Sequence, residues 1–258
     1  MKSAPFAYHA PASVDEALAL LAAHGDEASV LAGGQSLLPL LAMRLARPAH
    51  LVDIHRLDEL HRLEVDGEHV VVGAAVTQRR VERDARVAEV CPLLADAVPW
   101  IGHAAIRNRG TVGGSLCHAD PAAELPVVCV ASGATMTIAG TSGRRTVAAA
   151  EFFEMPFTTA VQPGELLVDV RIPVRRPGER WAFLEVARRH GDFPLVSVAV
   201  AGDAIALGGV AGRPVLVADV DAARDAVTAA DDIHATHEYR RHLAGVLVER
   251  ALARAAAA

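Results

Sequence analysis

The segment that decides the interpretation of this chain reads Ile106-Arg107-Asn108-Arg109-Gly110-Thr111-Val112-Gly113-Gly114-Ser115. Its three glycines permit positive φ angles and a close approach of the backbone to a ligand. Exposed N–H groups in such a turn, with the hydroxyls of Thr111 and Ser115 beside them, form a typical site for phosphate oxygens. The segment therefore predicts an anion-binding loop.

A second loop of the same kind lies upstream and reads Ala32-Gly33-Gly34-Gln35-Ser36-Leu37-Leu38-Pro39. Gly-Gly followed by a hydroxyl residue is common in ordinary turns, so either loop alone is weak evidence of binding. Neither loop has the spacing of a Rossmann turn, and the upstream loop lacks the lysine of a P-loop. Together the two loops indicate one ligand that is held from two sides around a phosphate-bearing centre.

The upstream loop belongs to a compact α/β unit. A capping box of Ser13 and Glu16 begins a helix, and residues 29–32 read as a buried strand that runs into the loop. Another helix follows, and residues 50–54 read as the next buried strand. The loop is thus expected at the carboxyl end of a strand, where α/β folds usually bind ligands.

Beyond this unit the pattern changes to a mixed sheet with helices, which includes a hairpin at Asp66-Gly67. A polar, turn-rich stretch at 174–179 then separates it from a segment with three short strands, followed by alanine-rich helices. The sequence predicts an α+β protein of two domains. These are an N-terminal domain at 1–175, with subdomains at about 1–55 and 56–175, and a C-terminal domain at 176–258.

Composition narrows the function classes. The net charge is −6 and the basic residues are scattered, so a nucleic-acid partner is not expected. No run approaches the roughly 20 apolar residues that cross a bilayer. The start of the sequence lacks the apolar core of a signal peptide. We therefore expect a cytoplasmic protein without a membrane span.

The cysteine and histidine patterns do not predict a metal site. Cys91, Cys117 and Cys129 are an odd number without CxxC spacing, which argues against a disulfide framework, a zinc site or an iron–sulfur cluster. The twelve histidines are spread along the chain. The nearest pair, His234 and His237, has no third ligand at helical spacing, so no bound metal is expected in this chain.

The two loops and the segments that follow them resemble the FAD-binding medium subunit of molybdenum hydroxylases. This group includes carbon monoxide dehydrogenase, nicotine dehydrogenase and 4-hydroxybenzoyl-CoA reductase, and xanthine dehydrogenase has the equivalent domain. The resemblance covers essentially the whole chain in the family's order. Besides the loops, the matching segments are His118 to Pro126, Pro163 to Leu167, Arg188 to Phe193, Asp231 to His234 and Tyr239 to Arg241.

The resemblance implies a two-part FAD-binding domain of the vanillyl-alcohol-oxidase (PCMH) type, followed by a small domain of a three-stranded sheet with helices. It also implies non-covalent FAD, with the diphosphate and adjoining groups held by backbone amides of both loops and the hydroxyls of Ser36 and Thr111. Glu124 would bond hydroxyls of the cofactor, and Leu166 or Leu167 would cover the flavin ring or the adenine. The expected cofactor-binding residues are Ala32, Gly33, Gly34, Gln35, Ser36, Leu37, Thr111, Val112, Gly113, Gly114, Ser115, Asp120, Glu124, Leu166 and Leu167.

Two pairs of charged side chains leave alternatives open. Arg107 and Arg109 either offset phosphate charge or lie on the surface or against a partner subunit. His118 and Asp120 suggest acid–base chemistry, but a flavin that moves electrons needs no dedicated nucleophile. We therefore assign no catalytic residue.

The function that the resemblance implies is an FAD-carrying electron-transfer subunit of a molybdenum-containing hydroxylase or dehydrogenase. Substrate would be oxidised at a molybdopterin cofactor in a large subunit, and electrons would pass through [2Fe–2S] clusters of a small subunit to FAD here, and then to an acceptor. The expected assembly is a dimer of heterotrimers. The substrate and the acceptor stay open. The alternatives are a stand-alone flavin oxidoreductase of the same fold and a non-catalytic nucleotide-binding or assembly protein.

Overall fold

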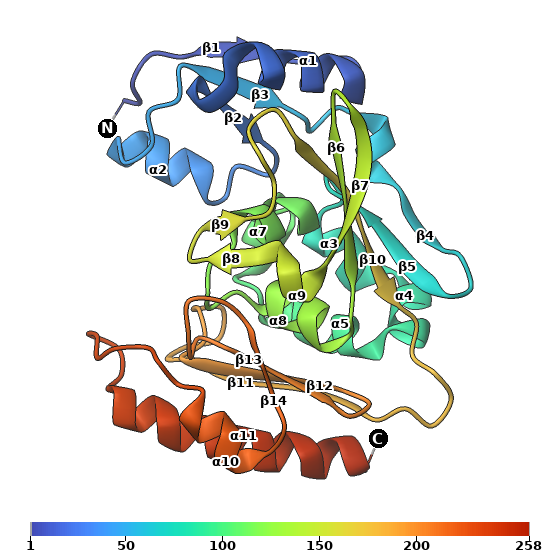
Figure 1. Ribbon diagram of the computed structural model, residues 1–258, viewed down its shortest axis with the longest axis vertical. Helices are drawn as coiled ribbons and strands as arrows, with labels where there is room; N and C mark the ends of the chain where they lie inside the picture. Colours follow the sequence, from blue (N-terminus) through green and yellow to red (C-terminus); the bar gives the residue numbers. More distant parts are fainter. Residues whose placement is uncertain (1, 258) are drawn as a thin grey trace.

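The computed structural model describes residues 2–257 and has the predicted α+β architecture. Its N-terminal unit is a parallel three-stranded sheet in the order β1-β3-β2, with α1 packed on one face (Figure 1). Ser13 caps α1 through its side chain, which accepts from the N–H of Glu16, as the capping box predicts. The elements are β1 (Ala7–His9), α1 (Val14–His24), β2 (Ala28–Leu31), α2 (Leu37–Met43) and β3 (His50–Asp53), with 3-10 turns at Gly25–Glu27 and Asp58–His61.

The middle unit is a five-stranded sheet in the order β4-β5-β10-β6-β7. All its neighbouring strands are antiparallel, so the expectation of a mixed sheet was wrong in this respect. The reason is that hairpins join β4 to β5 and β6 to β7, and β10 returns between them. The strands are β4 (Leu63–Val65), β5 (His69–Gly73), β6 (Thr135–Gly140), β7 (Gly143–Ala148) and β10 (Leu166–Pro173), and a small hairpin adds β8 (Phe153–Met155) and β9 (Thr158–Thr159).

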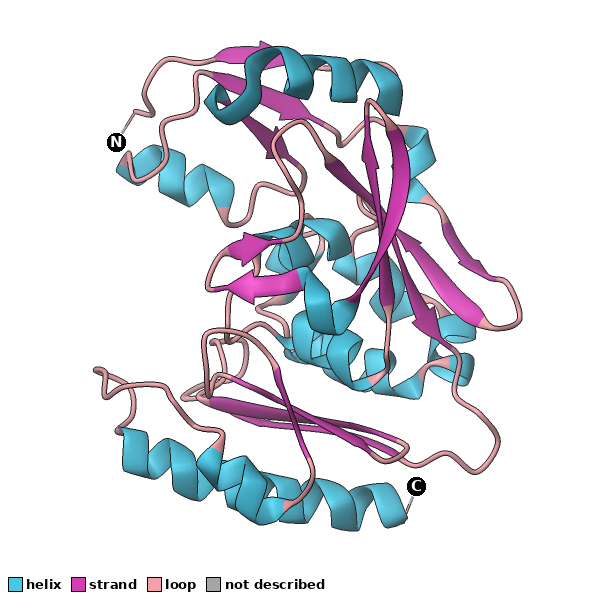
Figure 2. Ribbon diagram, viewed as in Figure 1, coloured by secondary structure: helices cyan, strands magenta, loops and turns pink. Residues whose placement is uncertain are grey.

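Short helices fill the middle of the molecule between this sheet and the C-terminal sheet (Figure 2). The most apolar of them begins at Glu124, and every one of its residues is buried. These helices are α3 (Gln78–Arg83), α4 (Ala85–Val90), α5 (Pro92–Ala97), α6 (Ala104–Arg107), α7 (Val112–His118), α8 (Glu124–Ala131) and α9 (Ala149–Phe152), with a 3-10 turn at Val98–Trp100.

The C-terminal sheet has four antiparallel strands in the order β11-β12-β13-β14, where the sequence predicted three. The additional strand, β14, has only three residues and lies half-exposed at the sheet edge, so its pattern is too short to recognise. One face of the sheet packs on α5 and α8, and the other on α10 and α11 (Figure 1). The elements are β11 (Trp181–Val186), β12 (Val196–Ala201), β13 (Ala204–Gly208), β14 (Val215–Val217), α10 (Val220–Asp225) and α11 (His237–Ala256).

Three apolar clusters hold the fold together. One lies between α1 and the parallel sheet, one around the central helices, and one between the C-terminal sheet and α11. The central cluster includes Phe183 and Ala199, so the C-terminal sheet shares a core with the helices of the middle unit. None of the helices within residues 2–257 combines the length and the apolar composition that a bilayer crossing requires.

Candidate functional site

The upstream loop is a tight turn between β2 and α2. Gly34 has a φ of 73°, which glycine adopts without strain. The Gln35 side chain folds back and donates through Nε2 to the carbonyl oxygen of Gly33, 3.2 Å away. The loop follows the carboxyl end of a parallel strand, as the sequence predicted.

The downstream segment is the start of a helix and not an open turn. Gly113 and Gly114 lie in the first turn of α7, and Thr111 is its N-cap, accepting from the N–H of Gly114 at 2.9 Å. Gly110, Gly113 and Gly114 do not have positive φ, so that part of the expectation was wrong. A Cβ on Gly113 would lie 2.6 Å from the Cα of Ala74, which shows that close packing, and not turn geometry, requires this glycine.

The backbone amides of the two loops differ in availability. The N–H of Val112 donates to Val76, and that of Gly113 donates to Ala74. With the Gly114 N–H on Thr111, the amides of residues 112–114 already have protein acceptors, whereas the N–H of Thr111 has none among the described residues. In contrast, among the described residues no hydrogen bond is made by the N–H groups of the upstream turn, Gly33 to Ser36. The backbone donors available to an anion therefore lie mainly in the upstream loop, and Thr111 adds one from the downstream segment.

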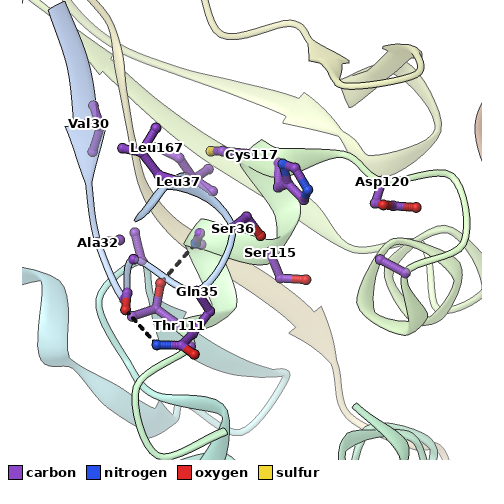
Figure 3. Close-up of a pocket in the computed structure, with 18 of the residues that line it drawn as sticks. Val30, Ala32, Gln35, Ser36, Leu37, Thr111, Ser115, Cys117, Asp120 and Leu167 are labelled. Carbon is purple, nitrogen blue, oxygen red and sulfur yellow. Dashed lines mark hydrogen bonds between the residues drawn. The ribbon is translucent and has the colours of Figure 1, made fainter. Parts of the chain in front are cut away.

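The two loops meet through their backbones. A Cβ built on Gly33 would lie 2.1 Å from the carbonyl oxygen of Arg109 and 2.9 Å from the Cα of Gly110. Figure 3 shows Ser36 from one loop and Ser115 and Asp120 from the other around the same space. Two segments about 75 residues apart in the sequence thus form one site, as the pairing of the motifs predicted.

Between the loops lies a cavity of about 390 Å³, which adjoins a second hollow of about 710 Å³; Ser36, His118 and Glu124 are among the residues that line both. The first volume is within the roughly 300–1,000 Å³ of typical cofactor sites. Every expected cofactor-binding residue lines the cavity except Val112, whose side chain is buried in the central apolar cluster. Val112 points inward because it follows the N-cap of α7 on the face that packs against the core.

The walls of the cavity combine apolar surface with a few polar groups. Leu166 and Leu167, at the start of β10, are buried and form part of the apolar wall with Ile101 and Ile106. Directly after these two leucines, between Leu167 and Asp169, the pairing of β10 with β6 shifts its register. Such a cavity suits a large planar ring with a polar tail.

Glu124 is the most perturbed acid in the cavity. It begins α8, is buried, and has its pKa raised to about 7 by desolvation, with a further contribution from the charge of Asp120. Asp120 also lines the cavity, but its Oδ1 accepts from the N–H of Ala122 at 2.9 Å and so supports the turn before α8. Near neutral pH the Glu124 carboxyl is therefore able either to donate or to accept a hydrogen bond.

Three polar residues of the cavity, Ser29, Gln78 and Glu165, were not expected from the sequence, and Gln78 is the buried one among them. Its side chain is buried and lines the cavity, and its Oε1 has no hydrogen-bond partner among the described residues. A buried acceptor without a partner costs free energy unless a ligand or water supplies a donor. The only sequence signal is that Gln78 follows Thr77, the N-cap of α3, and this gives no hint of a binding role.

Arg107 does not offset phosphate charge, and it is neither a surface residue nor available to a partner. Its buried guanidinium pairs with Glu82, at 2.9 Å from Nε to Oε2 and 3.0 Å from NH2 to Oε1. It also donates to the carbonyl oxygens of Ile101 and Gly102. The guanidinium groups of Arg107 and, to a smaller extent, Arg79 lower the pKa of Glu82 to about 2. Arg107 thus holds the segment that leads into the second loop, whereas Arg109 is exposed outside the cavity lining.

Similarity to known proteins agrees with this geometry. A family model described as "FAD binding domain in molybdopterin dehydrogenase" matches residues 4–175. The caffeine dehydrogenase subunit beta of Pseudomonas sp. (strain CBB1) is 40% identical in an alignment that covers 99% of this chain and 96% of the relative. This chain belongs to that family of FAD-binding domains. The carbon monoxide dehydrogenase medium chain of Hydrogenophaga pseudoflava is 37% identical, with 96% of each chain covered.

The fold agrees with the same family. The structure of carbon monoxide dehydrogenase from Hydrogenophaga pseudoflava that lacks the Mo-pyranopterin moiety contains a chain with 36% identity and a TM-score of 0.96, covering 100% of this chain and 99% of that one. Membership confirms the resemblance, the cofactor FAD and the oxidoreductase class. The available amides, the apolar wall and the unpartnered Gln78 oxygen fit this cofactor. The related subunits support an electron-transfer subunit over a stand-alone flavoenzyme.

Proposed function

We propose that the cavity between the two loops holds FAD without a covalent bond and that its diphosphate lies on the upstream turn. The observation that carries this proposal is the contact of Gly33 with Arg109, because it brings the unpaired amides of residues 33–36 to the edge of the cavity. Clustered amides without side-chain bulk suit a group with several acceptor oxygens.

The other residues follow from their positions around this centre. Ser36, Ser115 and Thr111 offer hydroxyl groups, and Thr111 also holds α7 in place. Leu37, Leu166 and Leu167 supply apolar cover for a ring system. Ala32, Gly33, Gly34, Gln35, Gly113 and Gly114 shape the floor, while Asp120, Glu124 and Gln78 are the polar groups for hydroxyl, amide or ring-edge atoms.

The chemistry that FAD supplies when bound is the exchange of electrons in steps of one or two. This chain binds the cofactor, and its apolar wall excludes water from the ring system. The Glu124 carboxyl can carry a proton beside the cofactor. Because the pKa of Glu124 is about 7, this carboxyl is placed to hold or release one proton near the cofactor. No side chain of the cavity needs to act as a nucleophile.

We further propose the partners and the place of the chain in its complex. A large molybdopterin-binding subunit and a small [2Fe–2S] subunit would assemble with it as a dimer of heterotrimers in the cytoplasm. The relatives are named as medium or beta subunits, which supports a multi-subunit assembly. Within the chain we propose an FAD-binding domain at 1–175, with subdomains at about 1–55 and 56–175, and a C-terminal domain at 176–258.

The direct test is reconstitution of the purified chain with FAD, followed by flavin content and fluorescence after gel filtration. We expect one FAD per chain that acid releases, because the bond is non-covalent. Riboflavin, which has no diphosphate, should bind far more weakly. Equal retention of riboflavin and FAD would contradict the diphosphate site. A chain that retains no flavin, alone or copurified with its native partners, would support the non-catalytic alternative.

A second measurement separates the electron-transfer subunit from a stand-alone flavoenzyme. The FAD-loaded chain alone should accept electrons from dithionite but should not turn over an organic substrate. The complex copurified with native partners should reduce an acceptor only when the flavin is present. Turnover of a defined substrate by the isolated chain would contradict the electron-transfer role.

A further inference from the structure

Three histidines that are far apart in the sequence come together at the rim of the N-terminal unit. They are His9 at the end of β1, His24 at the end of α1 and His50 at the start of β3. One ring nitrogen from each lies within 4.8 Å of the others. The cluster is separate from the FAD cavity, whose lining includes none of the three.

The fold brings them together through the periodicity of each element. His50 lies two residues before Val52 on β3, and so on the same face of the sheet, the face that α1 covers. Ala7 pairs with His50 in the parallel ladder, and His9 lies two residues beyond Ala7, so His9 shares that face. His24 follows Leu21 by three residues along α1 and therefore also points toward the sheet.

The three rings are closely arranged. Nε2 of His9 and Nδ1 of His50 are 3.0 Å apart, within hydrogen-bonding distance. The rings of His24 and His50 stack with their centroids 3.5 Å apart and an angle of 11° between their planes. All three residues are half-buried, which leaves the cluster open to solvent on one side. Each neutral imidazole has one ring nitrogen with a free lone pair, so three rings this close together offer three ligand atoms to one cation.

We propose that His9, His24 and His50 bind one divalent transition-metal ion of the Zn²⁺ class, with water in the open coordination position. In a tetrahedral zinc site with Zn–N bonds of about 2.0–2.1 Å, the ligand nitrogens lie roughly 3.3 Å apart. The His9–His50 pair already has nearly this separation, at 3.0 Å. Side-chain rotation of His24 supplies the remaining adjustment. Borderline-soft ions of this class prefer imidazole, whereas Mg²⁺ and Ca²⁺ prefer oxygen ligands.

The probe for the test is Zn²⁺ alone, titrated calorimetrically into the full chain after EDTA treatment and dialysis, with no polyhistidine tag. Co²⁺ then reports the geometry, because a tetrahedral site gives strong visible absorption. We expect one Zn²⁺ per chain, and at least about tenfold weaker binding in His24→Gln and His50→Gln, as loss of one of three ligands requires. Circular dichroism and flavin content show which variants are folded, and only folded variants are compared.

The matched control is His61→Gln. His61 and His55 form another close pair, with ring centroids 6.1 Å apart, on the same unit but outside the cluster. This control should bind Zn²⁺ as the unchanged protein does. The proposal is overturned if Zn²⁺ fails to bind in a one-to-one ratio, or if His50→Gln and His61→Gln bind it equally. The Zn²⁺ titration measures metal affinity and not electron transfer. A failed metal proposal therefore does not affect the FAD proposal, and a failed FAD proposal does not affect the metal proposal.

Discussion

Gly33 and Arg109 are in backbone contact, so close that a Cβ on Gly33 would fall 2.1 Å from the Arg109 carbonyl oxygen. This contact joins the parallel α/β unit to the helices of the middle unit at the edge of the cavity. The glycine is required by what lies against it, because its own φ is not in the left-handed region. The same contact that joins the two units therefore shapes the edge of the cavity in which we propose that FAD binds.

The first prediction concerns this contact. In Gly33→Ala the new methyl group would collide with backbone atoms of Arg109, which cannot rotate away as a side chain can. The two loops must therefore separate. We expect at least tenfold weaker FAD binding and a loss of stability of about 1–3 kcal/mol, as for overpacked sites. Gly140→Ala is the control, since its Cβ would meet nothing closer than 3.4 Å. Fluorescence titration and urea unfolding measure both effects. FAD affinity that is unchanged in Gly33→Ala would show that the contact does not shape the site.

The second prediction separates two neighbouring glycines. A Cβ on Gly113 meets the backbone of Ala74, whereas one on Gly114 meets the Thr111 hydroxyl at 2.8 Å and approaches Ala32 at 3.5 Å. Gly113→Ala should therefore lower the unfolding midpoint, and Gly114→Val should abolish flavin retention in a chain that still folds. Thermal unfolding of the flavin-free proteins and flavin content after gel filtration distinguish the two. A fully yellow Gly114→Val protein would refute the assignment of this residue to the cavity.

The third prediction concerns the buried ion pair. Arg107→Met removes the main partner of Glu82 but leaves its ion pair with Arg79 at 2.8 Å, so it should reduce the free energy of unfolding by no more than about 3–5 kcal/mol. The double variant Glu82→Gln/Arg107→Met should recover part of this loss, because the carboxylate that has lost Arg107 is then also removed. Arg109→Met, at an exposed site, should change stability by no more than about 0.5 kcal/mol. If Arg107→Met and Arg109→Met are equally stable, the structural role of Arg107 is wrong.

The fourth prediction is a pH dependence. Glu185 on β11 has both carboxylate oxygens buried without hydrogen-bond partners among the described residues, and desolvation with the nearby Glu124 charge raises its pKa to about 8. A raised carboxyl pKa favours the protonated folded state. Its contribution is complete below about pH 4.5 and is lost as the pH rises toward 8.

Glu185→Gln removes this titration, so the variant should gain stability relative to the unchanged protein between pH 5 and about 8, most at the upper end. Urea unfolding midpoints across that range measure the difference. Glu249→Gln, on the exposed side of α11, is the control and should follow the profile of the unchanged protein. Parallel profiles for Glu185→Gln and the unchanged protein would mean that Glu185 is ionised in the folded state.

Much of this arrangement was predictable from local patterns. The Ser13 cap and the turn at Gly67 are signals within a few residues, and both are present. The position of the upstream loop after a strand was predicted for the same reason, although β2 is half-buried and not buried as expected. The pairing of the two glycine motifs also indicated that both would line one site.

The features that could not be predicted depend on contacts between distant segments. Arg107 is buried because Glu82 lies opposite it, and Val112 is turned into the core because α7 begins there. Gln78 faces the cavity only because the chain at 110 packs against it. His9, His24 and His50 share no spacing that periodicity can detect, since three different elements bring them together.

The most direct test of the central claim is the crystal structure of the chain saturated with FAD. We predict that the diphosphate accepts hydrogen bonds from the N–H groups of residues 33–36 and that the ring system lies against Leu166 or Leu167. Gly33 should remain against Arg109. A structure in which FAD binds elsewhere, or in which its diphosphate does not touch the upstream turn, would contradict the account.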